Sequence, residues 1–168
     1  LVTTERVHVP VWGTQLTTPH VSAEYASVRL RTTIRNAGDA DVRISTDIIA
    51  PDGKIVARKD NSRKINHGQP FEQNFLINAP SLWSPETPYL YKAVSKIYVD
   101  GKQTDEYTTR FGIRSIEIIA DKGFFLNGKH RKFQGVCNHH DLGPLGAAVN
   151  VAALRRQLTL LKDMGCDA

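Results

Sequence analysis

Residues 28–35 read VRLRTTIR, and their side chains divide between two faces. Val28, Leu30 and Ile34 share one face with a threonine, whereas three arginines occupy the other. A repeat of two residues is typical of a β-strand that buries one face and exposes the other. The stretch therefore predicts a strand whose apolar side chains enter a core and whose arginines face water.

The same alternation recurs further along the chain. The runs 42–48 (VRISTDI), 71–77 (FEQNFLI) and 89–99 (YLYKAVSKIYV) place apolar side chains at most alternate positions, and Gln73 is an imperfection on the Phe71 face. Short strands separated by polar turns, with no helical period between them, predict an immunoglobulin-like β-sandwich over residues 1–112. Because the Cys–Trp–Cys core pattern of antibody domains is absent, the likeness concerns architecture alone.

Residues 113–168 have a different character. The Asn-Gly pair at 127–128, between the apolar runs 124–126 and 132–136, is the strongest short-range signal for a β-hairpin. We expect the second run to form a buried strand, followed by a loop rich in histidine and aspartate and then by one helix.

The expected helix has a start signal, an apolar stripe and a stop signal. Asn150 suits the N-cap, Leu154, Leu158 and Leu161 recur on one side, and Gly165 suits the position after the last turn. A strand–loop–helix unit normally leads to a parallel partner strand. The sequence ends before such a strand, so we expect the chain to be a piece of a longer protein.

Composition excludes several classes of protein. Hydrophobic residues make up 40% and charged residues 23%, which is typical of a soluble globular chain. The net charge of +5 comes from scattered basic residues, and the densest cluster, Arg29, Arg31 and Arg35, fits a solvated strand face. No aromatic residues interleave with it, as a single-stranded nucleic-acid site requires. We therefore expect no nucleic-acid partner.

No run approaches the ~20 apolar residues of a membrane span, so we expect no membrane partner. The first residues, LVTTER, lack the basic and apolar segments of a signal peptide, and the compartment stays unassigned. Cys137 and Cys166 are expected to be two buried thiols rather than a disulfide.

The stretch most suited to catalytic or binding chemistry is CNHHD at 137–141, directly after the expected strand. They could be solvated loop residues, partners for the local backbone or a chance cluster, or one histidine could act on a ligand. A metal site is not predicted, because neighbouring side chains of an extended segment point apart and no third ligand follows at a usable spacing. No cofactor is predicted either.

The segment WSPETPYLY at 83–91 is unusual because two prolines hold it extended ahead of a strand. Trp83 and Tyr89 offer large apolar surfaces, which could form a platform for a sugar ring. Alternatively, Trp83 pins a crossover loop to the sandwich.

Four stretches carry a family resemblance. Residues 83–91 resemble the "W-S-P-E-x-P-x-L-Y" signature of glycoside hydrolase family 2, the β-galactosidase and β-glucuronidase family, and residues 110–114 (RFGIR) resemble its "R-F-G-F-R" linker. Residues 125–139 resemble its "F-x-L-N-G-K" to "G-V-N-R-H" segment, and residues 154–168 its "D-L-x-L-M-K-x-x-N-x-N-A" segment. The resemblance covers nearly the whole chain.

The resemblance implies an immunoglobulin-like domain followed by the truncated start, the first βα unit, of a (β/α)₈ TIM barrel. Barrel active sites are built from the loops that follow the strands, which is where residues 137–141 would lie. By position, His139 matches the family histidine that lines the substrate pocket and hydrogen-bonds a sugar hydroxyl. Asn138 and Asp141 are further candidates for substrate binding, although Asp141 could equally stabilise the loop.

The sequence departs from the family pattern around His139. Cys137 stands where asparagine is common, Asn138 where arginine is common, and His140 where glutamate is common. These departures leave the sugar preference open. Retaining glycosidases need two carboxylates, which in this family are glutamates on later barrel strands. The chain has no Asn-Glu pair, so we expect no catalytic residue within it and no activity of the chain alone.

Three functions compete at this point. The first is the central part of a retaining β-glycosidase, in particular a β-galactosidase, with a carbohydrate substrate. The second is a non-catalytic immunoglobulin-like spacer or carbohydrate-binding module. Nucleic-acid binding, which rests on charge alone, is the weakest. We also expect the helix stripe to promote self-association, because it would lack its barrel.

Overall fold

The computed structural model describes residues 3–35, 38, 40–64, 69–139 and 141–167 of the 168-residue chain. The chain divides into two compact units. One comprises Leu1–Glu117 with Leu126–Gly128, and the other comprises Ile118–Phe125 with Lys129–Ala168.

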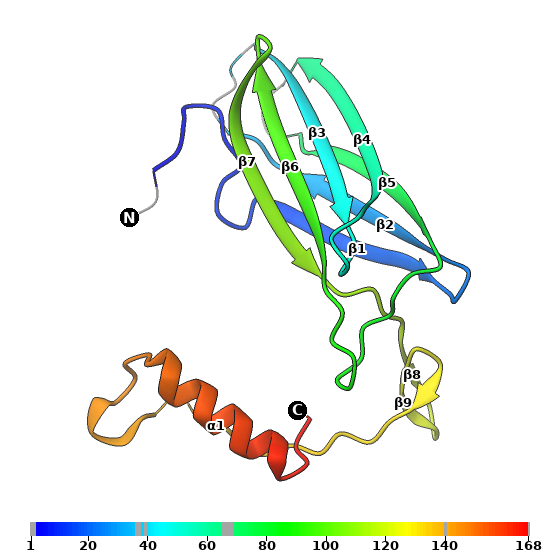
Figure 1. Cartoon of the computed structure of the whole chain (residues 1–168), viewed down its shortest axis with the longest axis vertical. Coiled ribbons are helices and arrows are strands. Elements are labelled where there is room, and N and C mark those ends of the chain that lie inside the picture. Colours follow the sequence, from blue (N-terminus) through cyan, green and yellow to red (C-terminus); the bar gives the residue numbers. More distant parts are fainter. Residues whose placement is uncertain (1–2, 36–37, 39, 65–68, 140, 168) are drawn as a thin grey trace. The chain divides into compact units, whose positions relative to one another are not determined.

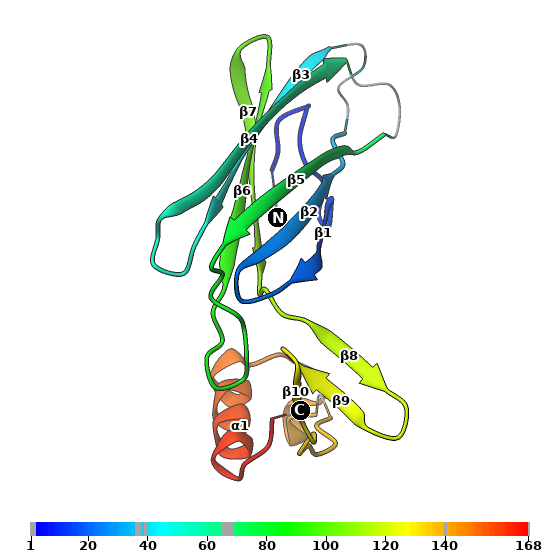
Figure 2. The same cartoon turned by 90° about the vertical axis from the view of Figure 1, so that its right-hand side faces the viewer.

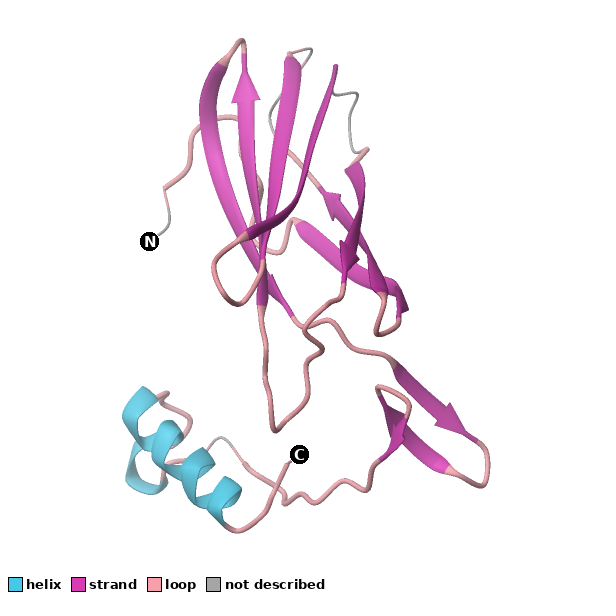
Figure 3. Ribbon diagram, turned by 45° about the vertical axis from the view of Figure 1, so that its right-hand side comes forward, coloured by secondary structure: helices cyan, strands magenta, loops and turns pink. Residues whose placement is uncertain are grey.

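The first unit is an immunoglobulin-like β-sandwich, as the sequence predicts (Figures 1 and 2). Its smaller sheet has the strand order β1-β2-β5 and its larger sheet the order β4-β3-β6-β7, with every neighbouring pair antiparallel. The strands are β1 (Thr14–Val21), β2 (Tyr25–Thr32), β3 (Asp41–Ile49), β4 (Ile55–Lys64), β5 (Phe71–Asn78), β6 (Tyr91–Val99) and β7 (Lys102–Phe111). Figure 3 shows the two layers of strands facing each other.

The alternation of apolar and polar residues in the sequence corresponds to an alternation of buried and exposed side chains along the strands. In β2, Val28 and Leu30 are buried whereas the arginines between them are exposed, and β3 and β5 show the same pattern. Apolar side chains from both sheets meet between the layers and form the core. Its largest members with almost no exposed surface are Leu30, Ile44, Ile48, Ile77, Ile97 and Ile113.

Gln73, the apparent fault in the β5 pattern, is fully buried in this core. Its Oε1 accepts a hydrogen bond of 2.7 Å from the hydroxyl of Thr46 in the facing sheet. Its amide nitrogen donates to the carbonyl of Lys59 and to Oδ1 of Asn61, each at 3.1 Å. Because all three bonds reach β3 and β4, this side chain ties the two sheets together without leaving its amide unsatisfied.

Tyr89 does not belong to the long strand that the sequence predicts. β6 begins only at Tyr91, and Tyr89 lies before it with 45% of its surface exposed. The amide of Tyr89 donates to the carbonyl of Thr87 at 2.7 Å, which is a tight local turn rather than a sheet bond. Because of this turn, Tyr89 does not take part in the alternation of buried and exposed side chains along β6.

The hairpin predicted at Asn127-Gly128 is confirmed. A three-stranded sheet has the order β10-β9-β8 and consists of β8 (Ile116–Ile119), β9 (Gly123–Leu126) and β10 (Lys129–His130). Asn127 and Gly128 have φ angles of 52° and 74°, as a type I′ turn requires of its two central residues.

The helix α1 (Val151–Asp163) also begins and ends as predicted. The Asn150 side chain accepts the amide hydrogen of Ala153 at 3.1 Å and caps the first turn. At the other end Gly165 has a φ of 90°, and the amides of Gly165 and Cys166 donate to the carbonyls of Lys162 and Leu161. This pair of bonds is a Schellman cap.

The buried strand expected over residues 132–136 is not formed. Residues 131–139 carry no regular secondary structure, and Val136 is 45% exposed. A strand needs a hydrogen-bonded neighbour along its length. Among the described residues, one backbone bond reaches this segment from the end of α1, from the amide of Asp167 to the carbonyl of Gln134 at 2.7 Å.

Two further expectations concern exposure. Cys137 is exposed, so the prediction of two buried thiols is wrong for it: the segment that was to bury it is not a strand. In α1 no residue is fully buried; within the stripe, Leu158 is 58% exposed whereas Leu154 and Leu161 are partly buried. Self-association through this stripe stays a prediction.

Of the helices in the described ranges, none is long and apolar enough to cross a bilayer.

Candidate functional site

The candidate site predicted from the sequence is the loop at residues 137–141. Cys137, Asn138, His139 and Asp141 are all exposed. His140 lies outside the described residues. Neither Asn138 nor His139 forms a hydrogen bond with another described residue, so their side-chain donors and acceptors face water. An imidazole and an amide so presented can exchange hydrogen bonds with ligand hydroxyls.

Asp141 organises the loop that follows. Its Oδ1 accepts the amide hydrogen of Gly143 at 2.8 Å, at the start of a 3₁₀ turn over Gly143–Leu145. The turn is closed by bonds from Gly146 to the carbonyl of Gly143 and from Leu142 to that of Gly146. Asp141 thus stabilises the loop, and its contribution to substrate binding stays a prediction.

Asp167 fixes the segment that leads to His139. Its Oδ2 accepts from Nε and Nη2 of Arg131, and its Oδ1 accepts the amide hydrogen of Gln134 at 2.9 Å. The Gln134 amide and the Arg131 guanidinium together hold the pKa of the Asp167 carboxyl below its ordinary value. The segment that precedes the loop and the end of α1 are thus joined at one carboxylate. We name this set of contacts the Asp167 clamp.

Sequence reasoning did not find the Asp167 clamp. Arg131 and Asp167 are separated by the whole loop and helix, and nothing in their spacing links them. Asp167 lies within a stretch that resembles the family pattern, but a resemblance does not specify which side chains touch.

The described part of the loop offers no complete set of catalytic groups. The last glutamate of the chain is Glu117, and Asp141 is the single carboxylate among residues 137–141. Hydrolysis with retention needs two carboxyl groups about 5–5.5 Å apart. Among the described residues, no group of three or more histidine, cysteine, aspartate or glutamate side chains is placed to hold a metal ion.

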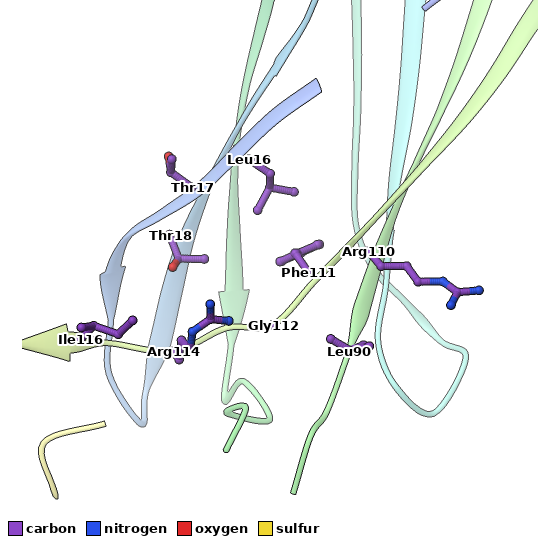
Figure 4. Close-up of a pocket in the computed structure, with 9 residues that line it drawn as sticks. All are labelled: Leu16, Thr17, Thr18, Leu90, Arg110, Phe111, Gly112, Arg114 and Ile116. Carbon is purple, nitrogen blue, oxygen red and sulfur yellow. The ribbon is translucent and has the colours of Figure 1, made fainter. Parts of the chain in front are cut away.

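A separate cavity of about 500 Å³ lies in the sandwich unit (Figure 4). Leu16, Phe111 and Leu90 supply apolar walls, and Thr18 and Arg114 supply polar groups. In Figure 4 the guanidinium of Arg110 points away from the other labelled side chains. None of the predicted site residues lines this cavity.

Comparison with known proteins assigns the chain to a family. The family model described as "Glycosyl hydrolases family 2" matches residues 9–114. The chain belongs to glycoside hydrolase family 2. This finding confirms the resemblance drawn from the four sequence stretches.

Several family 2 proteins resemble nearly the whole chain. It is 42% identical to "Beta-galactosidase BoGH2A" of Bacteroides ovatus over 96% of its length, which is 19% of that protein. It is 31% identical to a "Beta-glucuronidase" of Bacteroides fragilis over 93% of its length, or 23% of the relative. A crystal structure of a family 2 member from Bacteroides cellulosilyticus superposes with a TM-score of 0.88 and 36% identity, over 97% of this chain and 23% of the other. The chain thus spans about a fifth of the length of these relatives.

The structure explains why three family 2 stretches occur together. Trp83 packs against Gly112 of the RFGIR stretch, and its amide donates to the carbonyl of Ile113 at 2.8 Å. The guanidinium of Arg114 lies 4.9 Å from the centre of the indole ring. Asn127 of the third stretch donates to the carbonyl of Trp83 at 3.0 Å.

Trp83 is therefore half-buried and held on several sides, which favours a packing role over a platform for sugar. The three stretches meet around one side chain of the sandwich unit, and their joint presence in this family 2 chain has a structural cause.

Proposed function

We propose that this chain is part of a retaining β-glycosidase that cleaves β-linked galactosides. The observation that carries the proposal is the 42% identity, over nearly the entire chain, to the β-galactosidase of Bacteroides ovatus. Relatives named as β-glucuronidases are less similar, at 38% identity for the "Putative beta-glucuronidase" of Formosa agariphila and 31% for that of Bacteroides fragilis, and β-glucuronidase is for that reason the second candidate.

In this proposal residues 1–112 form the immunoglobulin-like domain, and residues 113–168 contribute the linker hairpin and the first βα unit of a (β/α)₈ barrel. Three features support that assignment: the hairpin at Asn127-Gly128, the capped helix α1, and the backbone bond from Asp167 to Gln134. The last of these is the kind of contact that two adjacent parallel strands would extend.

His139 has the leading role among the residues present. An imidazole nitrogen that hydrogen-bonds a sugar hydroxyl can bind more strongly as positive charge develops on the ring in the transition state. Asn138 and Asp141 would bind neighbouring hydroxyls. The acid/base and the nucleophile would both come from outside residues 1–168, so the chain alone is inactive.

The test compares two polypeptides on two substrates. The chain alone and the longer polypeptide that contains it are each incubated with an aryl β-galactoside and an aryl β-glucuronide. We expect turnover of the galactoside by the longer polypeptide only. Preferred turnover of the glucuronide would replace the first candidate with the second. Turnover by the chain alone, abolished by His139→Ala, would contradict the placement of the catalytic groups.

A further inference from the structure

A second cavity, of about 450 Å³, lies at one end of the sandwich and is built entirely from the first unit. Its lining residues come from the β3–β4 turn, the end of β5 and the segment that enters β6, and the course of these elements can be followed in Figure 2. Sites for small molecules typically occupy about 300–1,000 Å³ and combine apolar walls with a few polar groups. The residues that line this cavity include Asp52, Val56, Ile77, Asn78, Tyr89 and Tyr91.

Tyr91 supplies a buried polar group with unused capacity. Its side chain is only 2% exposed, and its hydroxyl oxygen accepts the amide hydrogen of Ser81 at 2.8 Å. No described residue accepts the hydrogen of that hydroxyl. A tyrosine hydroxyl can accept one hydrogen bond and donate another, so an oxygen atom of a molecule in the cavity could accept its hydrogen.

Tyr89 supplies an aromatic face at the opening. Tyr89 lies before β6 rather than in it, and it is 45% exposed. It lines the cavity together with the apolar side chains of Val56 and Ile77. An exposed tyrosine beside aliphatic walls offers a flat apolar surface with a polar rim. The apolar face of a pyranose ring is complementary to such a surface.

Asp52 and Asn78 supply hydrogen-bonding groups for hydroxyls. Lys54 donates to Asp52 twice, from its backbone amide at 3.1 Å and from Nζ at 2.9 Å, and this pairing keeps the carboxylate ionised. An ionised carboxylate has about four acceptor sites, so capacity remains for ligand hydroxyls. Because the ionised Asp52 lines the cavity and Lys54 does not, the site disfavours an anionic ligand relative to a neutral one.

We infer that this cavity is a binding subsite for a neutral hexopyranose, distinct from the loop that carries His139. The choice of a sugar rests on the proposed function, whereas the site itself consists of sandwich residues and needs no catalytic group. The subsite would hold a sugar unit on the immunoglobulin-like domain.

The experiment is an NMR titration of the ¹⁵N-labelled 168-residue chain with methyl β-galactopyranoside, and separately with glucuronate. We expect saturable shifts for the amides of residues 50–54, 77–81 and 89–91 with the galactoside. Tyr89→Ala should weaken binding about tenfold, in line with the loss of one aromatic contact. Asp52→Asn should weaken binding severalfold. Glucuronate should bind more weakly than the galactoside.

The matched control is Trp12→Ala, because Trp12 is 91% exposed and precedes the opposite end of the β1–β2 pair. It should leave the affinity unchanged. Absence of saturable shifts in the three amide groups, or shifts that neither Tyr89→Ala nor Asp52→Asn weakens, would overturn the inference. Since the titration measures binding without turnover, its failure is distinguishable from failure of the glycosidase assay.

Discussion

The backbone of Gly112 lies against the indole of Trp83 so closely that a Cβ on residue 112 would sit 2.8 Å from Cγ of the ring. Real Cβ atoms do not approach that closely, so either the ring or the backbone would have to move. The contact accounts for glycine at the centre of the RFGIR stretch.

Gly112→Ala should therefore destabilise the sandwich, by about 1–3 kcal/mol, because the added methyl group overpacks a filled space. Urea unfolding followed by far-ultraviolet circular dichroism measures this change in all variants, because it does not depend on the Trp83 indole. The double variant with Trp83→Ala removes the obstacle, so its loss should be smaller than the sum of the two single losses. Additive losses would show that the two residues do not interact.

Asn127 joins the hairpin turn to the Trp83 loop. Its Oδ1 accepts the amide hydrogen of Ser115 and its Nδ2 donates to the carbonyl of Trp83, each at 3.0 Å. Asn127→Gly preserves the positive φ of 52° but removes both side-chain bonds, and should cost about 1–3 kcal/mol through the unpaired Ser115 and Trp83 groups. Asn127→Ala should cost more, because alanine also resists the positive φ. Equal stability of Asn127→Gly and the wild type in urea would contradict this role.

Thr46→Val tests the buried hydrogen bonds around Gln73. The substitution conserves shape but leaves Oε1 of Gln73 without its partner inside the core, so we expect a loss of about 1–3 kcal/mol in unfolding free energy. Thr17→Val on the exposed face of β1 is the control and should change stability little. A neutral Thr46→Val would mean that water or a rearranged amide replaces the bond.

The Asp167 clamp should weaken in acid. The Gln134 amide and the Arg131 guanidinium lower the pKa of Asp167 in the folded chain, whereas an unfolded aspartate titrates near about 3.9. The clamp's stabilisation is thus fully present above that pH and is lost as the pH falls through the lowered folded value. The protection of the Gln134 amide, which is its hydrogen-exchange rate relative to the intrinsic rate at the same pH, should fall over that acid range.

Asp167→Asn should lower the protection of the Gln134 amide at neutral pH and remove the acid dependence of that protection. Asp163→Asn, in the last turn of α1, is the matched control and should leave both unchanged. A protection of the Gln134 amide that stays constant in acid in the wild type would contradict the clamp.

Period-two alternation was enough to predict the sandwich, because burial in a two-sheet core is decided side chain by side chain along each strand. Turn and cap chemistry was likewise enough for the Asn127-Gly128 hairpin and the ends of α1. Gln73 could not be interpreted in the same way, since its partners Thr46 and Asn61 lie in the facing sheet and become neighbours only in the fold.

The site was less predictable than the fold. Residues 132–136 have the composition of a buried strand, but composition cannot supply the neighbouring strand that such a segment needs. The cavity beside Tyr91 joins a turn, a strand end and a loop that are far apart in the sequence. Tyr89 suggested a strand that begins two residues later.

The most direct test of the account is the effect of His139→Ala on kcat/KM for an aryl β-galactoside, measured in the longer polypeptide that contains this chain. We expect a fall on the order of 10²–10³, the usual cost of removing one hydrogen bond that strengthens in the transition state. His8→Ala, far from the loop in sequence, serves as the control and should leave kcat/KM unchanged. An unchanged kcat/KM for His139→Ala would contradict the assignment of this loop to the substrate pocket.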